Sequence, residues 1–131
     1  MTDAKNPVAI NVGNPHCIFF VDKAEDISVE ELGKKIEHHS LFPDRTNVEF
    51  AEIITENQIR LRVWERGAGL TQACGSGACA TIVAATHRGL SGRKAEIIMD
   101  GGKLILEYKE NGHILMTGPV TYVFDGNLKD L

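Results

Sequence analysis

Residues 74–88, CGSGACATIVAATHR, limit the possible folds of this chain more than any other stretch. Their small and apolar side chains predict a helix with almost no polar face before Thr86-His87-Arg88, and Gly89 is placed to end it. A helix that is apolar on every side must be surrounded by protein. Strand patterns lie on both sides of this segment, so we expect a sheet that curves around the helix.

Short alternating or apolar runs predict the strands of this sheet. They cover residues 7–12, 17–21, 46–54, 58–65, 95–99, 103–109, 114–117 and 120–124. Turn-forming residues separate them, among them Gly13-Asn14-Pro15-His16, Asp100-Gly101-Gly102, Glu110-Asn111-Gly112 and Gly118-Pro119. The sequence therefore predicts an α+β domain in which a curved, barrel-like and mostly antiparallel sheet wraps around one buried apolar helix.

Residues 28–39 predict a second helix, which is amphipathic. Ser28 is placed to cap its start, and Glu31, three residues later, completes a capping-box pattern. Leu32 and Ile36 form the inward stripe. The side chains expected on its solvated face are Lys34, Lys35, Glu37, His38 and His39.

Composition excludes several classes of function. The 131 residues suffice for a single domain, and 43% hydrophobic with 24% charged side chains is an ordinary globular mixture. The 18 acidic and 14 basic side chains leave a net charge of −4. That balance does not suit a protein that binds nucleic acid or an anionic membrane, so we expect a soluble acidic domain.

The cysteines and the apolar stretches indicate a cytoplasmic protein. Cys17, Cys74 and Cys79 are too few and odd in number for a disulfide framework, and they match no zinc spacing. We therefore expect reduced thiols and no metal site. Residues 1–10 lack the pattern of a signal peptide. The longest nearly apolar stretch, residues 78–85, is far shorter than the ~20 residues of a membrane helix.

The segment Cys74-Gly75-Ser76-Gly77 opens the buried helix and is the strongest candidate for a site. Glycines at a helix start let a carboxylate or phosphate reach unpaired backbone N–H groups. The helix field favours the Cys74 thiolate by about 0.3–1 kcal/mol, or roughly 0.2–0.7 pKa units. A thiol whose unperturbed pKa is near 8.5 would remain mostly protonated at pH 7 after this shift, so other groups must help if Cys74 is to act as a base. The alternative is that Cys74 is one more small buried residue.

Two further motifs carry useful side chains. Glu65 and Arg66 stand where an alternating strand runs into the glycine-rich loop before Cys74. Glu65 suits an amine of a ligand, and Arg66 suits a carboxylate of a ligand. The alternative is that the two side chains form a surface salt bridge at the end of the strand. Asn14 and His16 place an amide and an imidazole on either side of a proline, where they could form a polar functional site. The alternative is an ordinary Asn-Pro turn in which the histidine makes only structural hydrogen bonds.

The remaining candidates are weaker. Asn47, in Arg45-Thr46-Asn47, would bind a carboxylate or tie down the start of a strand. His38-His39 fits the tail of a helix better than a pair of ligands. Cys17 and Cys79 fit the core, as free cysteines usually do.

Four segments together resemble one family. GNPHCIFFV, RTNVEF, ERGAGLTQACGSGACA and GPVTYVFDG occur in this order over nearly the whole chain, and together they are similar to the C-terminal domain of diaminopimelate epimerases. This resemblance implies a cytoplasmic enzyme of lysine and cell-wall precursor synthesis, which interconverts LL- and meso-diaminopimelate without pyridoxal phosphate or metal. It also implies two pseudo-symmetric domains, each a barrel-like sheet around a central helix, with two cysteines on opposite sides of the substrate α-carbon.

By the same resemblance, Cys74 is the cysteine that this domain supplies, and Glu65 contacts the substrate near it. The backbone N–H groups of Gly75 and Ser76 would hold the reacting carboxylate. His16 would lie near the other cysteine, and an imidazolium there favours a thiolate, whereas the Glu65 carboxylate favours a neutral thiol or takes its proton. The residues that would bind the far end of the substrate are Asn14, Asn47 and Arg66.

The family's N-terminal domain, with its cysteine, has no counterpart in these 131 residues. We therefore expect a C-terminal half that is inactive alone and self-associates through an uncovered apolar face, whereas whole enzymes of the family are homodimers. Three alternatives stay open: a related cofactor-independent isomerase of an amino or hydroxy acid, which would not need Asn14, Asn47 and Arg66; a non-catalytic anion-binding or dimerisation module; and a thiol hydrolase.

Overall fold

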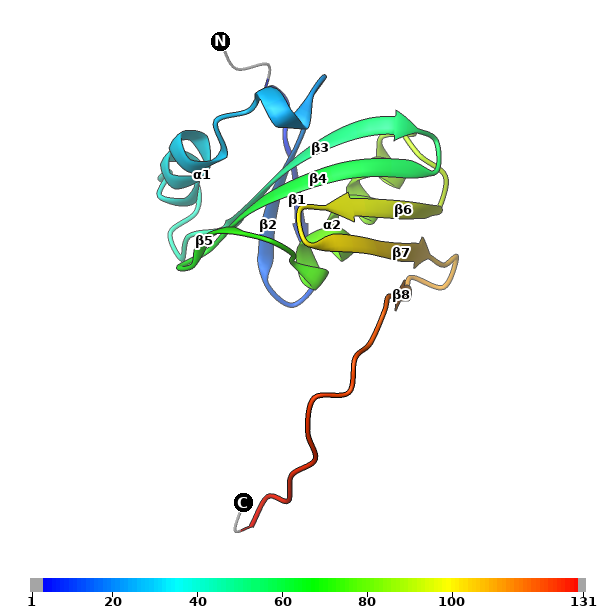
Figure 1. Ribbon diagram of the computed structural model, residues 1–131. Helices are drawn as coiled ribbons and strands as arrows, with labels where there is room; N and C mark the ends of the chain where they lie inside the picture. The colour runs from blue at the N-terminus through cyan, green and yellow to red at the C-terminus, as the bar shows by residue number, and fades with distance from the viewer. Residues whose placement is uncertain (1–3, 130–131) are drawn as a thin grey trace.

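The computed structural model describes residues 4–129, in which one curled sheet holds a helix in its hollow and another on its outer face (Figure 1). The strands are β1 (Val8–Asn11), β2 (Pro15–Phe20), β3 (Asn47–Thr55), β4 (Gln58–Glu65), β5 (Gly69–Thr71), β6 (Lys94–Met99), β7 (Gly102–Tyr108) and β8 (Ile114–Thr117). The helices are α1 (Val29–Glu37), α2 (Gly75–His87) and the short 3-10 helix η1 (Ala24–Asp26).

The sheet has the order β1-β2-β3-β4-β6-β7-β8, with β5 paired to β4. Five strand pairs are antiparallel, while β2–β3 and β4–β6 are parallel. Both parallel pairs are joined by connections that contain a helix, as parallel strands require. The expected α+β class is confirmed, and the sheet is a mixed, curled half-barrel in which antiparallel pairs prevail.

Side chains of alternating direction bury both faces of the sheet. In β2, Ile18 packs with α2, whereas Cys17 and Phe19 join the cluster under α1 and η1. In β3, Ala51 faces α2 while Phe50 faces the other way. This burial on two faces explains the continuous apolar run CIFFV. It also places the side chains of alternate residues, including His16 and Asn47, on the α2 side.

Helix α2 is buried as the sequence predicts. Ala78, Ala80, Ile82, Ala84 and Ala85 have no exposed surface, and the helix contacts six strands of the sheet. Its end is a Schellman motif, because the N–H groups of Gly89 and Leu90 donate to the carbonyls of Thr86 and Ala85. Gly89 has φ of +67°, a conformation that glycine adopts without strain. Among residues 4–129, no helix is long and apolar enough to cross a membrane.

The amphipathic helix differs from its prediction in two ways. It spans Val29–Glu37, and Ser28 occupies the N-cap position without a side-chain hydrogen bond, so the expected capping box does not form. Glu37 is buried rather than solvated, because its carboxylate accepts hydrogen bonds from Trp64 Nε1 at 2.8 Å and Gly67 N at 2.9 Å. The helix therefore uses Glu37 to hold the loop that follows β4.

The strand expected at residues 120–124 is absent. The chain after β8 is extended and leaves the sheet (Figure 1), and Val120, Tyr122 and Phe124 are each more than three-quarters exposed. Strand structure needs a neighbour for its hydrogen bonds, and within the described residues none lies beside this segment. Gly118-Pro119 accordingly forms no hairpin, and Pro119 has no N–H to donate to a ladder.

Other boundaries differ less. Pro15 and His16 belong to β2 rather than to the turn before it, which moves His16 into the buried part of the sheet. The short elements η1 and β5 were not expected from the sequence. Strand β5 is folded back on the end of β4 by Glu65-Arg66-Gly67-Ala68-Gly69, in which Gly67 and Gly69 have φ of +76° and +88°. This turn leads the chain from Glu65 to Cys74.

Candidate functional site

The start of α2 places a thiol at the helix N-terminus. Cys74 is the N-cap residue, and its Sγ accepts a hydrogen bond from Gly77 N at 3.3 Å. Gly75 and Ser76 follow in the first turn, where backbone N–H groups have no partner inside the helix. The arrangement can therefore hold an anion next to a sulfur atom.

A chain of polar contacts runs from this thiol into the sheet. Ser76 Oγ lies 3.5 Å from Cys74 Sγ and 3.2 Å from Asn14 Nδ2. Asn14 Oδ1 lies 2.9 Å from His16 Nε2, and His16 Nδ1 lies 2.5 Å from Glu49 Oε1. His16 and Glu49 are both fully buried at the side-chain level. The first turn of α2 and the parallel pair β2–β3 thus meet at one polar cluster.

Cys74 is a neutral thiol in this environment. Burial raises the pKa of Cys74 to about 11, and the neighbouring Glu65 carboxylate adds to this effect. Hydrogen bonds from Ser76 and from Gly77 N act in the opposite direction and lower the pKa, without cancelling the effect of burial. Glu65 thus lies near enough to Cys74 to disfavour a thiolate.

Asn47 and Arg66 lie at the edge of the cluster. Asn47 lies opposite His16 in the parallel pair β2–β3. Its side-chain amide accepts a hydrogen bond from Arg66 N at 2.8 Å and donates one to the Pro15 carbonyl at 2.9 Å, which links β3 to the loop after β4 and to the start of β2. Arg66 is exposed, with one guanidinium nitrogen 3.2 Å from the Asp44 carbonyl. The structure therefore brings Cys74, Glu65, Ser76, Asn14 and His16 together, and ties Arg66 to them through Asn47.

The sequence profile of the diaminopimelate epimerase family matches residues 8–123, which is most of the chain. The chain belongs to the diaminopimelate epimerase family. Diaminopimelate epimerase of Bacteroides thetaiotaomicron is 58% identical over 121 residues, covering 92% of this chain and 45% of the relative. The enzyme of Rhodospirillum centenum is 56% identical, covering 92% of this chain and 42% of the relative. The chain thus spans less than half the length of these curated relatives.

Solved structures support the fold of this diaminopimelate epimerase family domain. A PhzF-family phenazine biosynthesis protein of Bacillus anthracis superposes with a TM-score of 0.57 at 24% identity, covering 84% of this chain and 37% of that one. A PhzF-family protein of Enterococcus faecalis superposes with the same TM-score of 0.57 at 17% identity, covering 75% of this chain and 35% of that one. At these identities the likeness concerns the fold alone.

Two glutamates of this family domain were missed as candidates. Glu49 stands two residues after Asn47 in a strand, so the alternation of β3 places it on the same face as Asn47, toward α2. Reading that alternation would have placed Glu49 on the same face as Asn47, but not beside His16. Glu37 gave no comparable signal, because its role depends on the distant Trp64 and Gly67.

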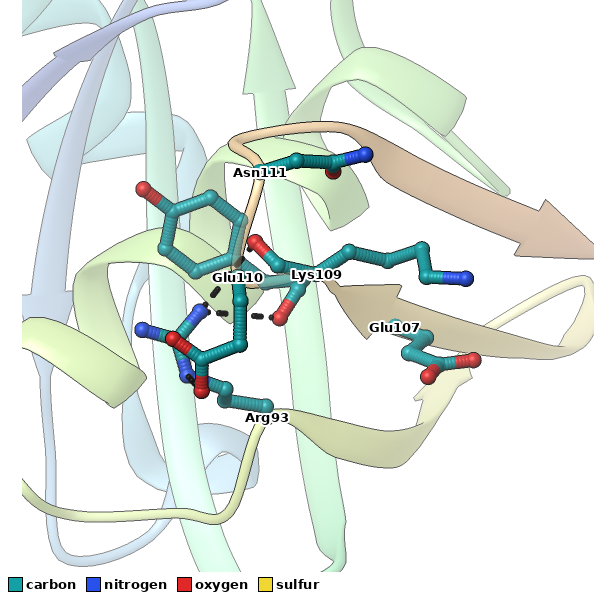
Figure 2. A pocket seen from close by; sticks show the side chains of 6 residues that line it. Arg93, Glu107, Lys109, Glu110 and Asn111 are labelled. Atoms are coloured by element: carbon teal, nitrogen blue, oxygen red, sulfur yellow. Dashed lines mark hydrogen bonds and ion pairs between the residues drawn. The ribbon is translucent and has the colours of Figure 1, made fainter.

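A surface depression at the far end of β6 and β7 is distinct from the Cys74 cluster. Arg93, Glu107, Lys109, Glu110 and Asn111 line it (Figure 2). The Arg93 guanidinium already has partners there: it donates hydrogen bonds to the carbonyls of Tyr108 and Lys109, and it forms an ion pair with Glu110 at 3.2 Å. These bonds join the loop after α2 to the β7–β8 turn. Within residues 4–129, no group of three His, Cys, Asp or Glu side chains is arranged to hold a metal.

Proposed function

We propose that this chain is the half of a diaminopimelate epimerase that supplies Cys74 as one of two acid–base thiols. The observation that carries the proposal is the position of Cys74 Sγ, which caps α2 beside Ser76 and Glu65 and next to unpaired helix N–H groups. A proton donor next to an anion site is what inversion at an amino-acid α-carbon requires from one side.

The thiol at rest carries its proton, since burial raises the pKa of Cys74 to about 11. In the proposed reaction, a thiolate on the opposite face of the substrate removes the α-proton, and Cys74 delivers its own proton to the α-carbon. The C–H bond that breaks and the C–H bond that forms lie on opposite faces, so the centre inverts. Cys74 is then the thiolate, and Glu65 is placed to limit its lifetime through charge repulsion.

The reacting carboxylate of the substrate would be held by the N–H groups of Gly75 and Ser76. The positive end of α2 would also stabilise the negative charge that develops as the α-proton leaves. Deprotonation at carbon is costly, so this stabilisation is the main contribution that the helix makes to the chemistry.

The distal end of diaminopimelate carries a second amine and carboxylate. Arg66 is exposed and suits the distal carboxylate, because a guanidinium binds a carboxylate through two parallel hydrogen bonds. Asn14 would contact the substrate after exchanging its bond to Ser76. Asn47 would act at the same end, where it already fixes the Arg66 backbone.

The second thiol would come from a second, pseudo-symmetric domain, and His16 would lie near it. Neither of the other cysteines of this chain suits that role. Cys17 packs among the side chains on the opposite face of the sheet, and Cys79 lies more than a turn further along α2, against the core. The proposal therefore includes a two-domain, cytoplasmic, homodimeric enzyme that uses no cofactor, with this chain inactive alone.

The test joins this chain to the N-terminal part of the Bacteroides thetaiotaomicron relative, giving a two-domain chimera. Conversion of LL- to meso-diaminopimelate is measured by chiral chromatography for the chimera and for the 131-residue chain alone. We expect turnover by the chimera and none by the chain. Turnover by the chain alone would contradict the division of the thiols. A folded chimera without turnover would point to another substrate or to a binding role.

A further inference from the structure

The buried contact between Glu49 and His16 is the polar feature that the proposed chemistry does not explain. The two side chains come from neighbouring parallel strands, with His16 two positions before Ile18, the residue that pairs with Glu49. Their side chains have no exposed surface, and Nδ1 lies 2.5 Å from Oε1. Burying a carboxylate costs free energy unless the carboxylate is paired. A role for the Glu49–His16 pair is therefore worth seeking.

The surroundings of Glu49 are shaped to admit a carboxylate. A Cβ atom on Gly77 would lie 2.9 Å from Glu49 Oε1 and 3.2 Å from Cys74 Sγ, so only glycine leaves room between the carboxylate and the thiol. Oε1 therefore lies against the first turn of α2, where the positive helix end favours negative charge. The other oxygen, Oε2, is buried without a hydrogen-bond partner. Glu49 is thus held mainly by its contact with His16.

We propose that Glu49 is a positioning residue for His16: its carboxylate accepts the Nδ1 proton and fixes the ring with Nε2 directed toward Asn14 and the active-site cluster. This inference rests on the proposed function, in which His16 acts beside the second thiol. We assign the proton in this contact to nitrogen, because an Nδ1–H donor on a carboxylate acceptor is the charge-assisted bond that offsets the cost of burying Glu49. A ring whose Nδ1 is held in this way has a fixed direction for Nε2, as a buried carboxylate orients a catalytic histidine.

Three other ionisable groups surround the pair. Cys17 on β2 and Glu65 at the end of β4 interact electrostatically with Glu49, and Cys74 lies across Gly77 on α2. Burial raises the pKa of the Glu49 carboxyl, Glu65 raises it further, and His16 lowers it. Cys17 and Cys74 are neutral thiols, because burial raises their pKa to about 12 and about 11. Among the described residues, His16 is therefore the only basic side chain in contact with Glu49.

The first test reads the ring directly in the 131-residue chain. Long-range ¹H–¹⁵N spectra at pH 8, with His16 assigned from a His16→Gln variant, report which ring nitrogen carries a proton. We expect a proton on Nδ1 that exchanges slowly with water. Glu49→Gln should lose this protection. Glu52→Gln, the same change in the same strand at a residue that instead bonds Ala24 N, should retain it.

A wild-type ring without a proton on Nδ1 would overturn the inference, whether or not Glu49→Gln folds. So would a folded Glu49→Gln variant with an unchanged Nδ1 proton and exchange rate, because Glu49 would then only fill space.

The second test uses the two-domain chimera. Glu49→Gln should lower kcat by about tenfold or more, which is part of the roughly 10²–10⁴-fold that a general acid or base contributes, and should leave KM nearly unchanged. It should also displace the pH profile, and Glu49→Asp, which keeps the charge, should recover part of the loss. An unchanged kcat and pH profile would contradict the inference. An inactive wild-type chimera would instead contradict the proposed function, and the ring spectra would still decide the role of Glu49.

Discussion

Cys74 Sγ caps helix α2 by accepting the hydrogen bond of Gly77 N at 3.3 Å, so the candidate catalytic atom is itself part of the helix start. Serine, threonine, aspartate and asparagine are the usual residues at this position. A sulfur atom there is held in a fixed direction, in a residue that is only 6% exposed. The same bond couples the reactivity of the thiol to the first turn of α2.

The reactivity of Cys74 should rise steeply with pH. Because burial raises the pKa of Cys74 to about 11, its rate of alkylation by iodoacetamide should increase about tenfold per pH unit between pH 7 and 10. Glu65→Gln should speed the reaction at any one pH, since Glu65 raises the pKa of Cys74, and Ser76→Ala should slow it, since Ser76 lowers that pKa. Peptide mass spectrometry measures each rate, with Cys79 as the internal reference. A rate that is flat with pH would show a thiolate already present at neutral pH.

Glu37 should stabilise the fold at neutral pH and lose this effect in acid. Burial by itself would raise the pKa of Glu37, but hydrogen bonds from Trp64 and Gly67, with the charges of His38 and Arg45, lower it overall. Its contribution is therefore present above the unfolded pKa near 4.3 and is lost as the pH falls through the lower folded value. We expect Glu37→Gln to cost about 1.5–3 kcal/mol at pH 7 by urea denaturation, and much less near pH 3.

The control for that change is Glu30→Gln, at an exposed position of the same helix, which should leave stability within about 0.5 kcal/mol. An equal effect of the two substitutions would contradict the account of Glu37.

Gly33 should be intolerant of any side chain. A Cβ atom at this position of α1 would overlap the Cβ and indole ring of Trp64, whose Nε1 donates to Glu37. We expect Gly33→Ala to destabilise the chain by about 1–3 kcal/mol, although alanine favours helix formation. Gly92→Ala is the matched control, because the nearest atom to its added Cβ is 3.8 Å away. A Gly33→Ala chain as stable as the wild type would show that α1 can move away from Trp64.

The apolar segment after β8 should drive self-association of the chain. Val120 and Phe124 are 96% and 79% exposed, and they lie in an extended run that pairs with no strand of the described residues. We expect the wild-type chain to sediment above its 14.3 kDa mass at micromolar concentration, and Val120→Ser with Phe124→Ser to bring it toward that mass. Leu41→Ser, which changes a 76% exposed side chain outside this segment, should leave the sedimenting mass unchanged. A monomeric wild-type chain would contradict this prediction.

Much of the fold could be predicted from the sequence because local patterns decided it. The apolar run after Cys74 required a surrounding sheet, and the alternation of Ile59, Leu61 and Val63 gave β4 its bounds, Gln58–Glu65. The predictions that were wrong depended on distant partners. Glu37 is buried because Trp64 reaches it, and residues 120–124 form no strand because none of the described strands lies beside them.

The candidate site was predicted by residue type but not by contact. The roles of Cys74, Glu65 and His16 stay predictions, while their proximity is now a structural finding. Glu49 was missed because its meaning depends on the parallel pairing of β2 and β3, which brings it to His16 from 33 residues away. Such a pairing cannot be inferred from periodicity alone, since alternation gives the face on which a side chain lies but not which strand runs alongside.

The most direct test of the central claim is deuterium incorporation at the α-carbon of diaminopimelate in D₂O, measured by NMR with the two-domain chimera. We expect exchange in the wild-type chimera, a loss of about 10²-fold or more in Cys74→Ala, and no change in Cys79→Ala, which removes a thiol further along the same helix. Exchange by a folded Cys74→Ala chimera at the wild-type rate would show that Cys74 is not one of the two acid–base thiols.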